Sequence, residues 1–373
     1  MELVRSLTPF VRRDLSEKLV LVSGPRQVGK TTLARALAPD AEYLNYDVRQ
    51  HRLHIVRQEW DRDNSLLILD ELHKMKGWKN WLKGVWDGRK HGQRILVTGS
   101  ARLDTFRRAG DSLAGRFFHY HLHPFSVREA GELLDPRACI ERMLVRGAFP
   151  EPFLAATDEA AARWRLSHLD RIARDDVDAI ERIRDIRQLE LLVDLLSERV
   201  GSTISYQNLA EDLSVSAPTV KRWIEVLEAL CVVFVLRPYA RASARSLRKE
   251  PKVFFYDTGR VEGDRGARLE NLVACHLLKR QHFLLDTRGE RRRLFFVRDK
   301  EKREVDFLSM KGTEPEFLVE VKISDVDPPK SLDYFATRIG CPSFHLVLDL
   351  DRKRSRGAIR VQPLSPWLAA LDA

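Results

Sequence analysis

The feature that most constrains this chain is a short segment near its beginning, GPRQVGKT at residues 24–31. It matches the pattern G-x-x-x-x-G-K-[ST], in which a glycine-rich loop wraps phosphate groups with its backbone N–H groups. The apolar run KLVLVS precedes it and the helical pattern TTLARALA follows it. A helix that begins at such a loop points the positive end of its dipole at the anion. The sequence therefore predicts a nucleotide-binding P-loop between a buried strand and a helix.

Each part of the P-loop has an expected role. Lys30 is expected to reach the β- and γ-phosphates, and the Thr31 hydroxyl to bind Mg²⁺. Since no N-K-x-D motif occurs, guanine specificity has no support and the expected nucleotide is ATP. The residues expected to bind ATP are Gly24, Pro25, Arg26, Gln27, Val28, Gly29, Lys30, Thr31 and Thr32.

A second segment, SLLILDEL at residues 65–72, supplies acidic residues at the end of an apolar run. Asp70 is expected to hold Mg²⁺, as the Walker B aspartate does in P-loop NTPases. Glu71 follows it directly and is expected to polarise the attacking water. The alternative is a strand that ends in two solvated acids. An adjacent aspartate and glutamate indicate hydrolysis rather than phosphate transfer to a second substrate.

Two further polar positions follow in the first third of the chain. The run ILVTGSA ends with Thr98 and Ser100, and Ser100 or Thr98 is expected to sense the γ-phosphate unless this segment is only a tight turn. Arg116, in DSLAGRFF, is a candidate arginine finger, which stabilises negative charge on the γ-phosphate in the transition state. If a neighbouring subunit supplies it, the chain works as a ring of identical subunits, for which a hexamer is the expected form.

Apolar runs that alternate with helical patterns predict a parallel sheet in this part of the chain. The expected strands cover 18–23, 41–47, 65–70, 93–98 and 117–122, and the expected helices include 30–38 and 78–90. Trp78, Trp81, Val85 and Trp86 recur at helical spacing, which we interpret as core packing rather than as a site.

The middle of the chain predicts helices and a helix-turn-helix. Residues 160–200 are helical and rich in charge, and a second pair of helices is expected within 206–239, with a turn before residue 217. The apolar run 229–236 is interpreted as a strand of a wing. A winged helix of this kind either reads DNA sequence or serves as a packing module and contacts the DNA backbone non-specifically, and we favour the second role.

The positive charge of the chain is concentrated in one segment. Residues 237–303 hold 19 Lys and Arg against 9 Asp and Glu, an excess equal to the net charge of +10 for all 373 residues. A local basic excess is typical of a protein that binds a polyanion. The expected partner is DNA, and the alternative is a solvated basic face.

Other classes of protein have little support. The four cysteines stand far apart without a C-x-x-C pair, which favours reduced core residues. The first residues lack the apolar segment of a secretory signal. The longest apolar stretch, 229–236, is far shorter than a membrane span. We therefore expect a cytoplasmic protein without a membrane partner.

The last third carries a second group of charged residues. The expected strands are 252–257, 294–298, 304–310, 317–323 and 344–350, with a helix at 268–280. Glu320 and Lys322 share one face of a strand because their spacing is two. Asp306 on a neighbouring strand and Glu270 on the helix are expected to join them. Such acids hold Mg²⁺ or Mn²⁺ in metal-assisted phosphodiester cleavage, and the lysine orients the water. The alternative is an exposed, charged strand face.

Taken together, these motifs resemble those of the prokaryotic AAA+ ATPases with a DUF4143 C-terminal region. The similar stretches are GPRQVGKTTL, LDELHK, TGSA, SLAGR, HPFSVREA, RGAFPE and REVDFL…EVK. The resemblance covers nearly the whole chain. This chain has TGSA where family members often show a second serine, and RGAFPE where two glycines are common.

The resemblance implies an α/β protein with three parts. These are an AAA+ P-loop ATPase domain at 1–155, a helical and winged-helix domain at 156–250, and a restriction-endonuclease-like PD-(D/E)xK domain at 251–373. It carries Lys30, Thr31, Asp70, Glu71 and Arg116 over to ATPase roles. It carries Glu270, Asp306, Glu320 and Lys322 over to a nuclease-type metal site.

We therefore expect a Mg²⁺-dependent ATPase that acts on branched or duplex DNA as a ring oligomer. One alternative is an ATP-driven switch or scaffold whose nuclease-like domain binds a partner without cutting. Another is an ATP-coupled endonuclease with a second Mg²⁺ or Mn²⁺ at the nuclease-like site.

Overall fold

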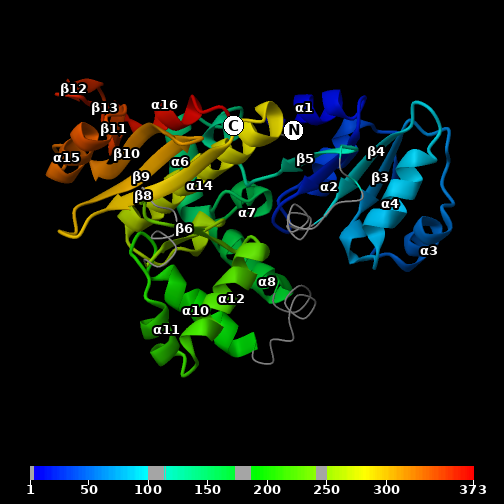
Figure 1. Cartoon of the computed structure of the whole chain (residues 1–373), viewed down its shortest axis with the longest axis horizontal. Coiled ribbons are helices and arrows are strands. Elements are labelled where there is room, and N and C mark those ends of the chain that lie inside the picture. The colour runs from blue at the N-terminus through cyan, green and yellow to red at the C-terminus, as the bar shows by residue number, and fades with distance from the viewer. Residues whose placement is uncertain (1–3, 100–112, 114, 173–185, 241–249) are drawn as a thin grey trace. The chain divides into compact units, whose positions relative to one another are not determined.

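The apolar runs in the first third of the chain form one sheet in the computed structural model (Figure 1). The structure describes residues 4–99, 113, 115–172, 186–240 and 250–373. The chain forms two compact units, residues 1–123 and 124–373. The first unit contains α1 (Thr8–Asp14), β1 (Leu19–Ser23), α2 (Lys30–Leu37), β2 (Glu42–Asn45), α3 (Arg49–Arg57), β3 (Leu66–Asp70), the 3-10 helix η1 (Leu72–Lys74), α4 (Trp78–Asp87), β4 (Arg94–Thr98) and β5 (Phe117–His121).

The strands of the first unit are parallel, in the order β2-β3-β4-β1-β5. Strands β1, β3 and most of β4 are buried, as expected for a parallel sheet covered by helices on its faces. The predicted strands are confirmed with slightly shorter bounds. Because β1 lies between β4 and β5, the loop after β1 starts at a switch in strand order, where open α/β sheets bind ligands.

The tryptophan-rich helix α4 packs against this sheet, as its periodicity predicts. Trp78 and Val85 are buried in a cluster with side chains of β3 and β4. Trp81 and Trp86 are half-buried against the same cluster. The interpretation of these residues as core packing is therefore confirmed.

The second unit is larger and contains two sheets. Its elements are α5 (Val127–Ala130), α6 (Pro136–Arg146), α7 (Pro150–Leu154), α8 (Asp158–Ile172), α10 (Ile186–Ser197), α11 (Tyr206–Asp212), α12 (Ala217–Ala229), β6 (Val233–Leu236), β7 (Lys252–Phe255), the 3-10 helix η4 (Thr258–Arg260), α14 (Arg265–Arg288), β8 (Arg292–Arg298), β9 (Glu304–Lys311), β10 (Glu314–Ser324), α15 (Lys330–Ile339), β11 (Ser343–Asp349), β12 (Arg354–Arg356), β13 (Ile359–Pro363) and α16 (Leu364–Ala369).

Helices α11 and α12 form the expected helix pair, and β6 and β7 form an antiparallel ribbon after it. The Ser216 side chain caps α12 by accepting a hydrogen bond from the N–H of Thr219, which fixes the turn before the helix. The strand expected from residue 229 begins four residues later. Helix α12 continues to Ala229, and Cys231 then takes a left-handed conformation (φ 53°) that turns the chain into β6.

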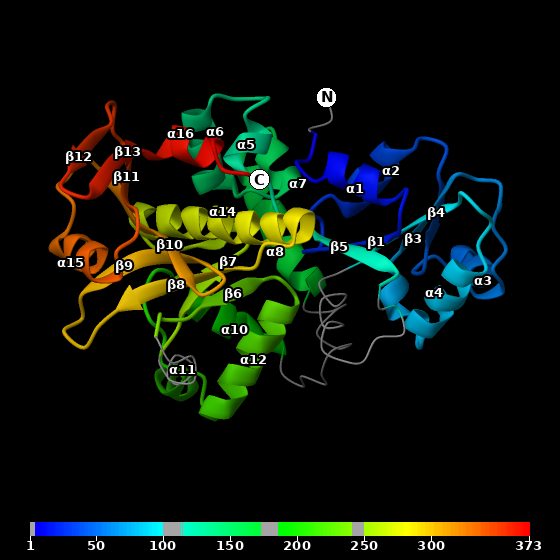
Figure 2. The ribbon, with the colours of Figure 1, turned by 45° about the horizontal axis from the view of Figure 1, so that its top comes forward.

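The larger sheet of the second unit has the order β12-β13-β11-β10-β9-β8 and is mixed. Strands β8, β9 and β10 are antiparallel neighbours, whereas β10 and β11 are parallel and joined through α15. Helix α14 runs along this sheet (Figure 2). It is longer than the sequence predicts, because it begins at the side-chain cap of Asp264 and ends at the left-handed Gly289.

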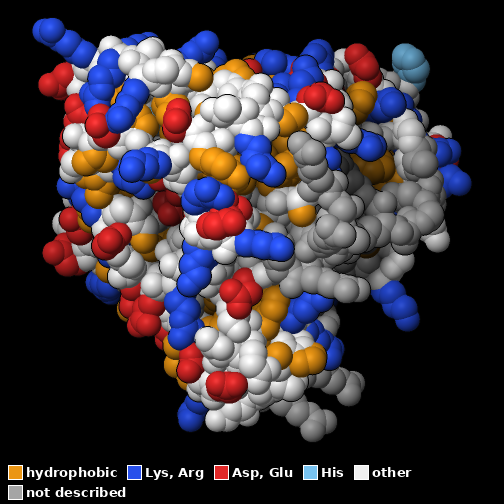
Figure 3. Space-filling model, turned by 60° about the vertical axis from the view of Figure 1, so that its left-hand side comes forward, with side chains coloured by type: hydrophobic (Ala, Val, Ile, Leu, Met, Phe, Trp, Pro, Cys, Tyr) orange, Lys and Arg blue, Asp and Glu red, His pale blue; other side chains and the backbone are white. Residues whose placement is uncertain are grey.

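Acidic neighbours balance much of the basic excess of residues 237–303. Arg298 pairs with Glu304 at 3.2 Å, and Arg265 pairs with Glu141 at 2.6 Å, and both acids lie outside the segment. On the face of the molecule that Figure 3 draws, Lys and Arg side chains lie among Asp and Glu side chains. The net charge of the segment therefore overstates the positive potential that its described residues present.

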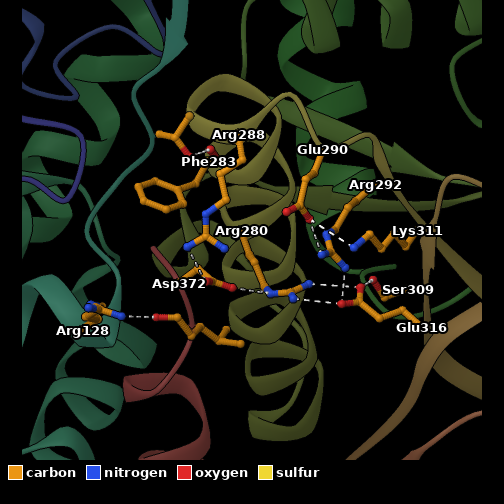
Figure 4. Close-up of polar contacts among 12 residues, drawn as sticks. Arg128, Arg280, Phe283, Arg288, Glu290, Arg292, Ser309, Lys311, Glu316 and Asp372 are labelled. Atoms are coloured by element: carbon orange, nitrogen blue, oxygen red, sulfur yellow. Dashed lines mark hydrogen bonds and ion pairs between the residues drawn. The ribbon is translucent and has the colours of Figure 1, made fainter. Parts of the chain in front are cut away.

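A polar network fastens α14 to β9, β10 and the C-terminal segment (Figure 4). Arg280 donates to both oxygens of Glu316, at 2.9 and 3.2 Å, and to Asp372 at 3.1 Å. Arg292 also pairs with Glu316, and Ser309 donates to it at 2.7 Å. Burial alone would raise the pKa of Glu316, but these hydrogen bonds lower it to about 2. The ionised carboxylate therefore stabilises the fold.

We expect Glu316→Gln to lower the free energy of unfolding of the second unit by about 2 kcal/mol at pH 7, since hydrogen bonds to charged groups contribute about 1.5–3 kcal/mol. The pKa of Glu316 is lowered in the folded state, so its contribution is complete above the ordinary value of 4.5 and is lost as the pH falls toward about 2. Urea unfolding across this range measures the difference. Glu314→Gln, an exposed change on the same strand, is the control. Equal pH profiles for Glu316→Gln and wild type would contradict the assignment.

Among the helices that the structure describes, none combines the length and apolar composition needed to cross a membrane.

Candidate functional site

The P-loop connects the carboxyl end of β1 to the first residue of α2. Gly24 must be glycine, because a Cβ there would lie 2.2 Å from the carbonyl oxygen of Leu122. Gly29 has φ 96° and directly precedes the helix. Lys30 is buried, and its Nζ donates to the carbonyl oxygens of Gly24 and Pro25 at 3.0 and 2.7 Å. The lysine is therefore folded over the loop that it is expected to serve.

A residue that the sequence does not reveal also supports the loop. The buried Arg5 donates from Nη1 to the carbonyl oxygen of Val28 at 3.0 Å and from Nη2 to that of His123. An arginine before α1 carries no motif, so only the fold shows that it contacts the P-loop. It holds the backbone of Val28 in place next to Gly29.

Asp70, at the end of β3, accepts four hydrogen bonds. Its Oδ2 accepts from the hydroxyl of Thr31 at 3.0 Å and from that of Tyr43 at 2.6 Å. Its Oδ1 accepts from the Thr98 hydroxyl and, at 3.0 Å, from the N–H of Glu71. The structure thus brings together the Thr31 and Asp70 oxygens that the sequence assigns to Mg²⁺. Two adjacent oxygen ligands suit this ion, which prefers carboxylates and other oxygen donors.

Glu71 follows in a left-handed conformation (φ 56°), which is uncommon for a residue with a side chain. Its N–H donates to the carbonyl oxygen of Thr98 at 2.9 Å, next to the last paired residues of β3 and β4. Its carboxylate is mostly buried, 3.4 Å from Lys74 Nζ and 3.8 Å from His73 Nε2. Burial raises the pKa of Glu71, although Lys30 and Lys74 lower it.

Tyr43, on β2, is a second residue that the sequence does not reveal. Its hydroxyl donates to Asp70 and accepts from Asn45 Nδ2 at 3.2 Å. Burial and the hydrogen bond to Asp70 raise the pKa of Tyr43 to about 12, so the hydroxyl stays protonated and remains a donor. Tyr43 therefore holds Oδ2 of the Asp70 carboxylate while Thr98 holds Oδ1.

The remaining predicted residues of the first unit do not all lie at this site. Ser100 lies outside the residues that the structure describes, and Thr98 contacts Asp70. Arg116 directly precedes β5, next to the first residue of β1, and pairs with Asp87 at 3.0 Å. The P-loop follows the last residue of β1, whereas Arg116 lies beside the first. In its own chain, Arg116 is therefore at the opposite end of the strand from the P-loop.

The structure brings the predicted residues of the last third into one neighbourhood. Glu320 and Lys322 pair on β10 at 2.7 Å. Asp306 on β9 accepts from the N–H of Val321 at 2.8 Å, so it lies beside Glu320. Burial raises the pKa of both Asp306 and Glu320. Burial and the charge of Asp306 raise the pKa of Glu270 to about 8.

Lys252, which belongs to no sequence motif, is also part of this cluster. Lys252 Nζ lies 2.9 Å from Glu270 and 2.7 Å from Glu304. Among the described residues, no group of three or more His, Cys, Asp or Glu side chains is arranged to hold a metal ion. The acidic residues therefore meet cations of the chain itself.

Three protein families match consecutive parts of the chain. Residues 16–131 match the AAA domain, residues 137–262 match a domain of unknown function, DUF8612, and residues 265–365 match another, DUF4143. The first match covers the P-loop, Asp70 and Glu71. The third covers Glu270, Asp306, Glu320 and Lys322.

The curated relatives are uncharacterized proteins of prokaryotes. A Mycobacterium tuberculosis protein is 28% identical over 261 residues, which cover 66% of this chain and 58% of the relative. The chain thus spans little more than half the length of that relative. A Methanocaldococcus jannaschii protein is 23% identical over 344 residues, with 80% and 74% of the two chains covered.

Similar solved structures include two proteins of low identity. A Walker-type ATPase of Pyrococcus abyssi is 13% identical with a TM-score of 0.42, over 68% of this chain and 93% of that one. A variant of Thermotoga maritima RuvB is 19% identical with a TM-score of 0.30, over 61% and 86%. The family matches agree with the motifs and with the parallel sheet. The chain is therefore an α/β protein that carries an ATPase domain of the AAA type followed by a DUF4143 region.

Proposed function

We propose that the protein hydrolyses ATP with Mg²⁺ and couples hydrolysis to the binding and remodelling of branched or duplex DNA. The contact that carries the proposal is the 3.0 Å hydrogen bond between Thr31 Oγ1 and Asp70 Oδ2. It joins the P-loop to the strand that ends in the acidic pair, with Glu71 beside it. This arrangement is what hydrolysis of a nucleoside triphosphate requires.

The residues divide the reaction among them. The P-loop amides and Lys30 bind the phosphates, and Thr31 with Asp70 would hold Mg²⁺. When bound, Mg²⁺ offsets negative charge on the β- and γ-phosphate oxygens. Glu71 orients a water and accepts its proton as the water oxygen bonds to the γ-phosphorus. The bond from that phosphorus to the β–γ bridging oxygen breaks, giving ADP and inorganic phosphate.

The proposal for oligomeric form follows from the position of Arg116. In its own chain, Arg116 lies at the end of β1 opposite the P-loop. A role at the γ-phosphate therefore requires that Arg116 act on a neighbouring subunit. A ring of subunits, hexameric in our proposal, supplies that neighbour. We also propose domain limits near residues 155 and 250, with a winged helix in the middle domain.

The proposal for DNA depends on the helix pair and the ribbon of the second unit. Helix α12 exposes Lys221 and Arg222 near its N-terminus. The segment that joins β6 to β7 adds four arginines and a lysine between 237 and 249. Basic side chains on such a helix and wing contact phosphates.

ATP hydrolysis with and without DNA tests the proposal. We expect single-stranded, duplex or four-way-junction DNA to stimulate the rate of ATP hydrolysis several-fold, most strongly with one of the three. Lys30→Ala serves as the inactive reference. A rate of ATP hydrolysis that none of these DNAs changes would contradict the coupling of hydrolysis to DNA. It would support an ATP-driven switch whose second unit binds another partner.

Binding to duplex DNA is expected to weaken steeply with salt, because each phosphate contact releases counterions. The double change Lys221→Ala/Arg222→Ala should make the dependence of the binding constant on salt less steep. The negative slope of log K against log salt should shrink in magnitude by about 0.9 per lost phosphate contact. Fluorescence anisotropy at several salt concentrations measures the slope. Lys76→Ala, an exposed lysine of the first unit, is the matched control. A slope that the double change leaves unaltered would remove α12 from the DNA surface.

Tyr43→Phe is expected to reduce kcat several-fold and to raise the Mg²⁺ concentration needed for half-maximal activity about 10-fold. The change removes one donor to Asp70, and a hydrogen bond to a charged group contributes about 1.5–3 kcal/mol. Steady-state hydrolysis across a Mg²⁺ titration measures both quantities. Tyr46→Phe, on the segment after β2, is the control. A Tyr43→Phe protein with wild-type Mg²⁺ dependence would show that the tyrosine does not position Asp70.

A further inference from the structure

The acids predicted to bind a metal in the second unit are each held by a partner from the chain. Glu270 pairs with Lys252 at 2.9 Å, and Glu320 pairs with Lys322 at 2.7 Å. Asp306 accepts the N–H of Val321 at 2.8 Å. Among the described residues, no three His, Cys, Asp or Glu side chains have the arrangement of metal ligands. Oε2 of Glu320 is buried without a hydrogen-bond partner among the described residues, but one such oxygen does not make the ligand set that the metal of a nuclease site requires.

Lys252 explains why the cluster lacks a place for a metal ion. It is the first residue of β7, and its side chain is only 1% exposed. A buried ammonium is unfavourable unless it is paired and hydrogen-bonded. Here two carboxylates contact Nζ, Glu270 at 2.9 Å and Glu304 at 2.7 Å. Burial would lower the pKa of Lys252, but the surrounding carboxylates raise it above the ordinary value, so the side chain stays charged.

The backbone closes the cluster from another direction. Gly201 has φ 81°, and a Cβ at this position would lie 2.7 Å from Oε2 of Glu270. The carboxylate of Glu270 is thus enclosed between the main chain at Gly201 and the ammonium of Lys252. The next residues also join the enclosure, since Thr203 forms a bridge with Lys252.

We infer that Lys252 is the resident cation of this carboxylate cluster, and that the DUF4143 region does not cut DNA through a metal ion. The ammonium takes the place beside Glu270 and Glu304 that a divalent cation would need. This inference goes beyond the proposed function and does not depend on it, because it concerns the second unit without nucleotide.

Titration with Mn²⁺ followed by electron paramagnetic resonance tests the inference on the full chain without nucleotide. An Asp70→Asn background removes the acidic ligand of the first unit. In this background we expect no stoichiometric Mn²⁺ binding. Adding Lys252→Met should create one Mn²⁺ site per chain and a melting temperature that rises with Mn²⁺. Lys300→Met, an exposed lysine of the same region, should change neither.

One stoichiometric Mn²⁺ per chain in the background protein, lost on Glu270→Gln, would overturn the inference. Cleavage of plasmid or branched DNA in Mn²⁺ that Asp306→Asn abolishes would also overturn it. A folded Lys252→Met protein that gains no Mn²⁺ would show that the lysine does not exclude the ion. If Lys252→Met does not fold, the titration and cleavage measurements on chains that keep Lys252 still decide the question. Failure of the proposed function would appear separately, as ATP hydrolysis that ignores DNA.

Discussion

Glu71→Gln is expected to reduce kcat for ATP hydrolysis by about 10²–10⁴-fold, the usual contribution of a positioned general base. Glutamine keeps the shape of the side chain and its place beside Asp70 but cannot accept the proton of the attacking water. The left-handed backbone of residue 71 (φ 56°) serves glutamine as well as glutamate, so the local fold should persist. The variant should therefore bind ATP but hydrolyse it very slowly.

A phosphate-release assay measures kcat, and a fluorescent ATP analogue measures nucleotide affinity. We expect affinity within a few-fold of wild type, which separates loss of chemistry from loss of the site. Glu59→Gln, an exposed acid of the same unit, is the control. Wild-type turnover by Glu71→Gln would show that another group activates the water.

Lys279→Met is expected to destabilise the second unit by about 3–5 kcal/mol, the effect of leaving a buried charge without its partner. Nζ of Lys279 donates to Glu129 Oε2, and the two side chains are only 9% and 2% exposed. Lys279 also donates to the carbonyl oxygen of Pro124 at 3.1 Å. The pair therefore joins α14 to the segment that begins the second unit.

Guanidinium unfolding of the variant measures this loss. The double variant Lys279→Met/Glu129→Gln should recover much of the stability, because no charge then remains buried and unpaired. A single variant within about 1 kcal/mol of wild type, the usual effect of an ordinary substitution, would contradict the expectation. So would a double variant that is as unstable as the single one.

The sequence predicts the elements of the first unit because its signals are local. The P-loop, the apolar strands and the acidic pair each occupy a few consecutive residues, and the structure places Thr31, Asp70 and Glu71 together as expected. Arg5 and Tyr43 were not predictable in this way. They act across sequence separations of 23 and 27 residues through the pairing of strands and loops, and neither belongs to a motif.

In the second unit, contacts between residues far apart in the sequence are even harder to predict. Its strands and the neighbourhood of Asp306, Glu320 and Lys322 follow from alternation along β9 and β10. The partner of Glu270 does not, because Lys252 comes from a separate ribbon and looks in sequence like one more basic residue. The net charge of residues 237–303 likewise predicts a basic surface, whereas in the fold acids from outside the segment, such as Glu304 and Glu141, pair with its arginines.

The hydrogen bond from Val321 to Asp306 has a consequence for how this cluster can be observed in solution. Regular pairing of β9 with β10 extends to Phe307 and Val319, and beyond it the Val321 amide is held by a side chain rather than by the opposite strand. Its exchange with solvent deuterium therefore reports on the Asp306 carboxylate, because opening that one contact exposes the amide. A single backbone proton can thus register any ligand that draws Asp306 away, without a label or a change of sequence.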